Sequence, residues 1–117
     1  LTVKEFEEET NLRATFLLDA SASMDYGSNL AHKYEYATML VGSLAYLLLR
    51  QSDSVGLKVF DDSLRVEIPH RNVQNHLRTL LHGMQVVKPA KKYDFAAIMG
   101  EVAEQDFHRG LVVLVSD

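Results

Sequence analysis

The sequence has no cysteine and only two prolines among its 117 residues. Without cysteine the chain has no disulfides, no thiolate catalysis and no cysteine-based zinc site, which suits a reducing compartment. No signal peptide is visible, and the longest apolar stretch, residues 39–49, is too short to cross a bilayer. We therefore expect a cytoplasmic protein with no membrane segment in this chain.

An excess of positive charge is also missing, since 16 acidic residues outnumber 12 basic ones and the net charge is −4. Nucleic-acid-binding domains usually carry a basic stripe, so we expect no nucleic-acid partner. The sequence lacks a glycine-rich dinucleotide or phosphate-binding motif, lacks Gly-x-Ser-x-Gly, and has no histidine pair at the zinc-helix spacing. The usual motifs of nucleotide and hydrolase chemistry are therefore absent, and we expect no enzymatic activity.

What the sequence does have is the apolar periodicity of a single α/β domain covering residues 1–117. The predicted order is strand, helix, strand, strand, helix, helix, strand. Both prolines, Pro69 and Pro89, fall in predicted loops. The strands are expected at residues 12–19, 55–60, 64–68 and 111–115, and the helices at about 33–51, 72–84 and 94–102.

The predicted helix over residues 33–51 is apolar around most of its circumference. We expect such a helix to be largely buried against a sheet. Its periodic apolar residues are Tyr36, Met39, Leu40, Leu44, Leu47 and Leu48, and the apolar face is widened by Ala37, Val41, Ala45 and Tyr46.

The connections predict which strands are neighbours. A right-handed crossover makes the first strand parallel to the second, and the short turn at residues 61–63 makes the second and third strands a hairpin. The chain then returns through two helices to the other side of the first strand. The strands at 12–19 and 111–115 therefore become neighbours, and open α/β sheets bind ligands at the carboxyl ends of strands at such a switch point.

Acidic and hydroxyl residues collect at this point. Asp19 ends the first strand, Asp117 follows the last one, and Ser21 and Ser23 succeed Asp19 at every second position. Adjacent carboxylates repel each other unless a proton or cation intervenes, and residues two apart on an extended chain point the same way. We predict that these oxygen ligands form a divalent-cation site, for which Mg²⁺, Mn²⁺ or Ca²⁺ is preferred over zinc or copper. The alternative is a polar loop that only caps the next helix.

Residues 19–23, Asp-Ala-Ser-Ala-Ser, resemble the start of the metal-ion-dependent adhesion site of von Willebrand factor A domains, and residues 111–117 resemble the later strand that ends in an aspartate. More narrowly, residues 4–9, 55–57 and 113–117 resemble the bacterial branch catalogued as domain of unknown function 58. The likeness covers the whole chain. It implies a three-layer α/β sandwich with a mostly parallel sheet and one antiparallel edge strand. It also implies further elements after Asp117, so we expect a fragment truncated at its C-terminus.

The chain departs from the family pattern before the predicted third helix. The family supplies a threonine there, just ahead of an aspartate, whereas this sequence has Tyr93 ahead of Asp94. Either Asp94 replaces the threonine as a ligand, directly or through water, or the site is weakened or lost. Asp94 also suits the N-cap of the helix that follows it.

The resemblance implies a non-enzymatic protein-binding module, in which the cation keeps one coordination position open for an acidic residue of a partner. It further implies a MoxR-type ATPase of the AAA+ class as a partner. One alternative is a Mg²⁺-dependent phosphotransferase of the haloacid dehalogenase type, which also has an aspartate at the end of a buried strand. Its second aspartate is replaced here by Ser21, which cannot act as a general acid near neutral pH. The other alternative is a metal-free interaction domain of the same fold, which Tyr93 favours.

Overall fold

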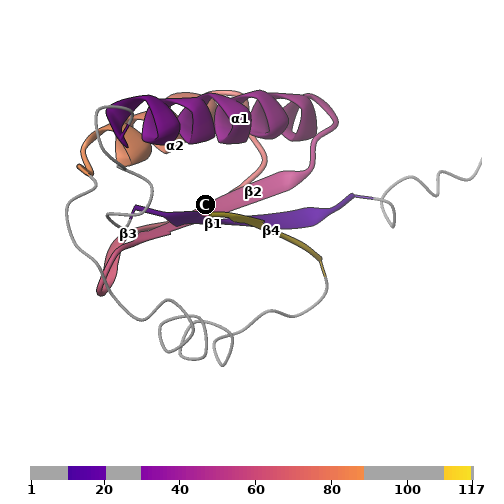
Figure 1. Ribbon diagram of the computed structural model, residues 1–117. Coiled ribbons are helices and arrows are strands. Elements are labelled where there is room, and N and C mark those ends of the chain that lie inside the picture. Colours follow the sequence, from indigo (N-terminus) through magenta and orange to yellow (C-terminus); the bar gives the residue numbers. More distant parts are fainter. Residues whose placement is uncertain (1–10, 21–29, 89–109, 117) are drawn as a thin grey trace, which may run out of the picture.

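The computed structural model describes residues 11–20, 30–88 and 110–116, and this part of the chain forms a four-stranded sheet and two helices (Figure 1). The four strands and two helices predicted within these residues are confirmed, with ends shifted by a few residues. The predicted helix that begins at Asp94 lies outside the described residues. In chain order the elements are β1 (Arg13–Asp19), α1 (Leu30–Arg50), β2 (Ser54–Phe60), β3 (Leu64–Arg71), α2 (His76–Gln85) and β4 (Leu111–Val115).

The strands lie in the order β3-β2-β1-β4. β1 pairs in parallel with β2 on one side and with β4 on the other, whereas β2 pairs antiparallel with β3. The predicted hairpin and the predicted adjacency of the first and last strands are therefore confirmed. Both α1 and α2 cover the same face of the sheet (Figure 1). The fold is thus α/β with a mixed sheet.

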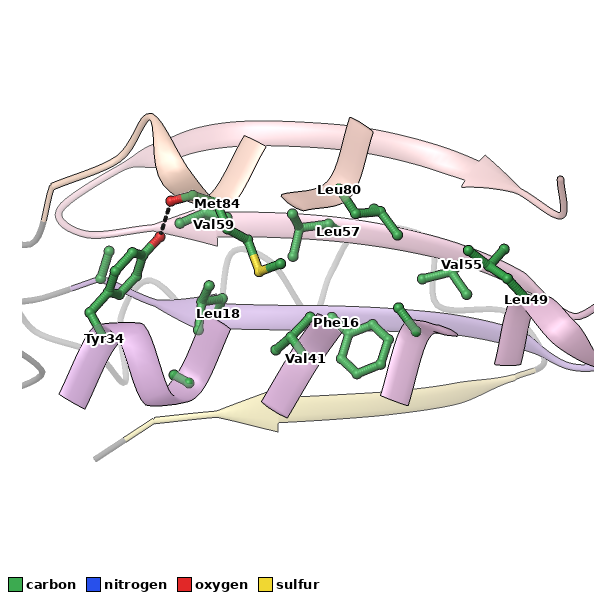
Figure 2. Close-up of a cluster of buried hydrophobic side chains, with 13 residues drawn as sticks. Phe16, Leu18, Tyr34, Val41, Leu49, Val55, Leu57, Val59, Leu80 and Met84 are labelled. Atoms are coloured by element: carbon green, nitrogen blue, oxygen red, sulfur yellow. Dashed lines mark hydrogen bonds between the residues drawn. The ribbon is translucent and has the colours of Figure 1, made fainter. Parts of the chain in front are cut away.

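The apolar core lies between the sheet and the two helices. Phe16 and Leu18 of β1 join Leu57 of β2, Val41 of α1 and Leu80 of α2 in one cluster, and each of these side chains is at most 1% exposed (Figure 2). Fully burying an apolar side chain of this size contributes about 1.5–3 kcal/mol. This cluster therefore fixes the position of both helices on the sheet.

Tyr34 joins the two helices at one end of the core. Its hydroxyl donates a 2.7 Å hydrogen bond to the backbone carbonyl of Met84 in α2 (Figure 2). Burial raises the pKa of Tyr34 well above the ordinary value of a phenol, so the hydroxyl stays protonated and remains a donor. The bond also satisfies a carbonyl of the last turn of α2, which has no partner within the helix.

The prediction that α1 is largely buried is wrong for one of its faces. Its second apolar face is exposed, with Tyr36 and Met39 at 70% and 68% exposure and Leu40, Tyr46 and Leu47 also exposed. The face that contacts the sheet includes small residues, which let the helix approach closely. When apolar residues surround a helix, periodicity alone cannot choose between its faces. The buried apolar side chains of α1 are Tyr34, Ala37, Val41, Ala45 and Leu49.

Pro69 lies inside β3, and its predicted place in a loop is also wrong. β3 continues to Arg71, beyond the predicted end at residue 68. Proline has no backbone N–H to donate, so a strand with a neighbour on only one side is where a sheet tolerates it. β3 is such a strand within the described sheet, because β2 is its partner and it stands at the end of the strand order.

His70 reaches from β3 across β2 to β1. Its ring lies against Gly56, and its Nε2 is 2.7 Å from the hydroxyl of Thr15. Gly56 alternates with core residues of β2, so this contact lies on the sheet face turned away from the helices. Burial lowers the pKa of His70, and neighbouring cationic side chains lower it further, so the ring stays neutral near pH 7.

The substitution Gly56→Ala is expected to lower the free energy of unfolding by about 1–3 kcal/mol, the usual cost of overpacking. The added Cβ would lie 2.8 Å from Cε1 of His70 and would force the ring off Thr15. Urea denaturation followed by circular dichroism measures the change. Gly42→Ala is the matched control. Its added Cβ would contact only the flexible end of the Leu81 side chain, at 3.0 Å, and alanine has a higher helix propensity than glycine. An equal loss of stability in both variants would contradict this account.

Candidate functional site at the carboxyl edge of the sheet

The carboxyl ends of β1, β2 and β4 meet at one edge of the sheet because the three strands run parallel. In the register, Asp19 lies opposite Phe60 of β2, and Leu18 lies opposite Val115 of β4. Asp19 and Ser116 are therefore neighbours just where β1 and β4 end. We call this region the carboxyl edge, and it is where the sequence predicts the cation site.

Asp19 is buried at the carboxyl edge, with 2% of its surface exposed. The hydroxyl of Ser116 donates a 2.8 Å hydrogen bond to its Oδ2. Beyond Asp19, the backbone N–H of Ala20 donates to the carbonyl of Phe60 at 2.8 Å, so the chain leaves β1 still attached to β2. A buried carboxylate needs such partners, because desolvation without them costs several kcal/mol.

Four of the five predicted cation ligands, Ser21, Ser23, Asp94 and Asp117, lie outside the described residues. Their convergence on Asp19 stays a prediction. Across residues 11–20, 30–88 and 110–116, no three side chains of histidine, aspartate or glutamate form a group that could hold a metal ion. What the structure establishes is that β1 and β4, the strands predicted to carry Asp19 and Asp117, lie side by side.

Three aspartates are buried in the described part of the chain: Asp19, Asp53 and Asp61. Asp53 lies at the opposite edge of the sheet, just before β2, where its Oδ1 accepts a 2.8 Å hydrogen bond from the backbone N–H of Leu12. Its Oδ2 has no hydrogen-bond partner among the described residues. Asp53 therefore ties the turn after α1 to the segment that leads into β1, and the carboxyl edge keeps the other two acids.

Asp61 follows β2 directly, and the sequence analysis assigned it only to a hairpin turn. The turn is confirmed, but the structure also buries the side chain to 2% exposure. Its Oδ2 accepts a 2.8 Å hydrogen bond from Nε of Arg65, and its Oδ1 accepts one of 3.2 Å from the backbone N–H of Ser63. The signal that could have identified it is its position as the first residue after a buried strand.

The electrostatics of Asp61 favour its ionised form. Burial on its own would raise the pKa, but hydrogen bonds that Asp61 accepts from the side chain of Arg65 and from the backbone of the turn outweigh it. The net effect is a pKa below the ordinary value of aspartate. Asp61 is thus an ionised carboxylate used to hold the hairpin, and its partners belong to the hairpin itself.

The fold and its acids define a class: a mixed α/β domain with buried carboxylates where parallel strands end. Comparison with known families is more specific. The family model described as "Protein of unknown function DUF58" matches residues 1–117, so the chain belongs to this family.

The chain is similar to mycobacterial proteins whose printed names give no function. It is 21% identical to the uncharacterized protein Mb1516 of Mycobacterium bovis over 118 residues, which cover 98% of this chain and 37% of the relative. The uncharacterized proteins MT1527 and Rv1480 of Mycobacterium tuberculosis match with the same identity and the same coverage. The chain therefore spans little more than a third of the length of these curated relatives.

Neither α1 nor α2, the helices that the structure describes, is long and apolar enough to span a membrane.

The substitution Arg65→Met is expected to raise the pKa of Asp61, because it removes the cationic donor 2.8 Å from Oδ2. In the wild type the lowered pKa of Asp61 stabilises the fold at pH values above the ordinary pKa of aspartate. This stabilisation is lost as the pH falls through the lowered pKa of Asp61. Acid unfolding of the variant should therefore begin at a higher pH. Circular dichroism during acid titration and NMR titration of the Asp61 carboxyl group measure the two effects.

The control for this experiment is Arg78→Met, which removes an exposed cation from α2. Its acid unfolding should follow that of the wild type. If both variants unfold at the same pH, the shift reflects net charge, and the Asp61–Arg65 pair is not its cause.

Proposed function

We propose that the chain is a non-enzymatic, divalent-cation-dependent protein-binding module with a von Willebrand factor A-like fold. The observation that carries the proposal is the hydrogen bond between Ser116 and Asp19 at the adjoining ends of β1 and β4. It brings the first predicted ligand next to the residue that precedes Asp117. Ser21 and Ser23 follow Asp19 by two and four positions, and Asp94 completes the proposed set.

The chemistry of the proposed ligands fits a hard cation. Asp19 offers a carboxylate, Ser21 and Ser23 offer hydroxyls, and oxygen atoms of this kind suit Mg²⁺, Mn²⁺ and Ca²⁺. Asp61, the other buried acid at the carboxyl edge, is already compensated by Arg65. The proposed ligands therefore come from β1, β4 and the segments that follow or precede them. β2 pairs with β1 and supplies no ligand.

Each part of the chain has a separate task in this proposal. Parallel pairing holds the ends of β1 and β4 together, and burial fixes Asp19 within a region of low dielectric constant, where charge interactions are stronger than in water. A bound cation supplies an open coordination position that an acidic residue of a partner can fill. The likeness to the bacterial branch whose proteins are often associated with MoxR-type ATPases supports such an AAA+ ATPase as the partner.

Addition of Mg²⁺ or Mn²⁺ is expected to raise the melting temperature of the wild type in a concentration-dependent way. A ligand of the native state at about 100 times its Kd stabilises by about 2.7 kcal/mol. Asp19→Asn keeps the size of the side chain and an oxygen for Ser116, but it removes the charge, so the shift should disappear. Differential scanning calorimetry with and without cation measures both proteins.

Asp62→Asn is the matched control for Asp19→Asn. It removes one carboxylate charge close to the same edge, from a side chain that is 43% exposed. This variant should keep the cation-dependent shift. A wild type whose melting temperature does not respond to Mg²⁺, Mn²⁺ or Ca²⁺ would contradict the proposal and favour the metal-free interaction domain.

Binding of a purified MoxR-type ATPase tests the partner. We expect binding in Mg²⁺ to be lost in EDTA and in Asp19→Asn, as measured by biolayer interferometry, and to be kept in Asp62→Asn. Binding that EDTA leaves unchanged would show that no cation bridges the two proteins. Turnover of an aryl phosphate that requires Mg²⁺ and disappears in Asp19→Asn would instead support the phosphotransferase alternative.

A further inference from the structure

Ser116 is an exposed residue whose hydroxyl is directed at a buried carboxylate. Its Oγ lies 2.8 Å from Oδ2 of Asp19, although the two residues are 97 positions apart in the sequence. Ser116 itself is exposed, whereas Asp19 is 2% exposed. We infer that Ser116 is a positioning residue that fixes the Asp19 carboxylate in the orientation needed to bind a cation. This inference rests on the proposed function and adds to it a residue that the sequence analysis did not include.

The hydrogen bond matters because a carboxylate rotates easily about its last side-chain bond. The terminal torsion of aspartate is broad, with no sharp preference of its own. A donor on Oδ2 limits that rotation and occupies one of the lone pairs of the carboxylate, so the remaining lone pairs take defined directions. A ligand oriented in this way loses less freedom when it binds a cation.

The bond is not needed to hold β4 in place. The backbone ladder already pairs β4 with β1 over five residues, from Ala14 opposite Leu111 to Leu18 opposite Val115. Val113 and Val115 also pack against the apolar core. The backbone ladder and the packing of Val113 and Val115 already fix the register and position of β4. The Ser116 hydroxyl therefore acts on the orientation of Asp19 more than on the position of β4.

Hydrogen bonds from outer residues to ligating groups have a known scale. Removing one typically weakens metal affinity by about 10-fold to 100-fold. We therefore expect Ser116→Ala to weaken Mn²⁺ binding by about that factor, as measured by isothermal titration calorimetry with MnCl₂. Ser116→Thr keeps the hydroxyl on the same atom position and should restore the affinity to within about 3-fold, which a loss of packing alone would not explain.

Ser63→Ala is the matched control for the loss of a hydroxyl at the same edge. Ser63 is exposed and follows the end of β2, and the turn uses its backbone N–H and carbonyl. Its substitution should leave Mn²⁺ affinity unchanged. If the wild type binds Mn²⁺ and Ser116→Ala binds it with equal affinity, the positioning role is overturned while the proposed function stands.

A second measurement without metal separates this inference from the proposed function. In a double-mutant cycle, Ser116→Ala should lower the melting temperature of the wild type but have little effect in an Asp19→Ala background. Equal effects in both backgrounds would show that the hydroxyl does not act through Asp19, and would overturn the inference. A wild type that binds no cation would overturn the proposed function and the positioning role together, while a coupling measured in this cycle would still identify the Ser116–Asp19 bond as a structural one.

Discussion

The parallel pairing of β1 with a strand on each side is the constraint on which the rest of the structure depends. Because β2 and β4 run in the same direction as β1, the ends of all three strands lie along one edge, and Asp19 is placed between Phe60 and Ser116. The residues of β1 from Ala14 to Asp19 are all buried, so the strand cannot shift by one residue without moving an apolar side chain out of the core. The register and the chemistry of the carboxyl edge are therefore set by the same contacts.

Most of the fold could be predicted from the sequence because the apolar pattern and the connection rules act over short distances. The run at residues 15–18 indicates a buried strand, and the two-helix return to β4 indicates which strands are neighbours. The exposed face of α1 could not be predicted, since Tyr36 and Met39 are as apolar as the residues that the sheet covers. Pro69 in β3 was missed for a similar reason, because only the strand order shows that β3 has a partner on one side.

The candidate site could be predicted only in part. Asp19 was singled out because it ends a buried strand, and the structure confirms that position, its burial and the adjacency of β4. Its role as a cation ligand stays a prediction. Ser116 and Asp61 were missed because their roles depend on contacts between distant segments or on burial, which a residue type does not reveal. The contact between His70 and Gly56 could not be predicted for the same reason. The sequence does not show that the His70 ring of β3 lies against Gly56 of β2.

The span of the Ser116–Asp19 hydrogen bond has a consequence for how the protein is made. During synthesis Asp19 leaves the ribosome 97 residues before the partner that holds it, so the edge stays incomplete while the helices and the hairpin already have their own neighbours. Closing a loop of this length costs chain entropy that is repaid only when β4 docks. Any molecule that recognises both strand ends can therefore bind only after β4 has docked beside β1.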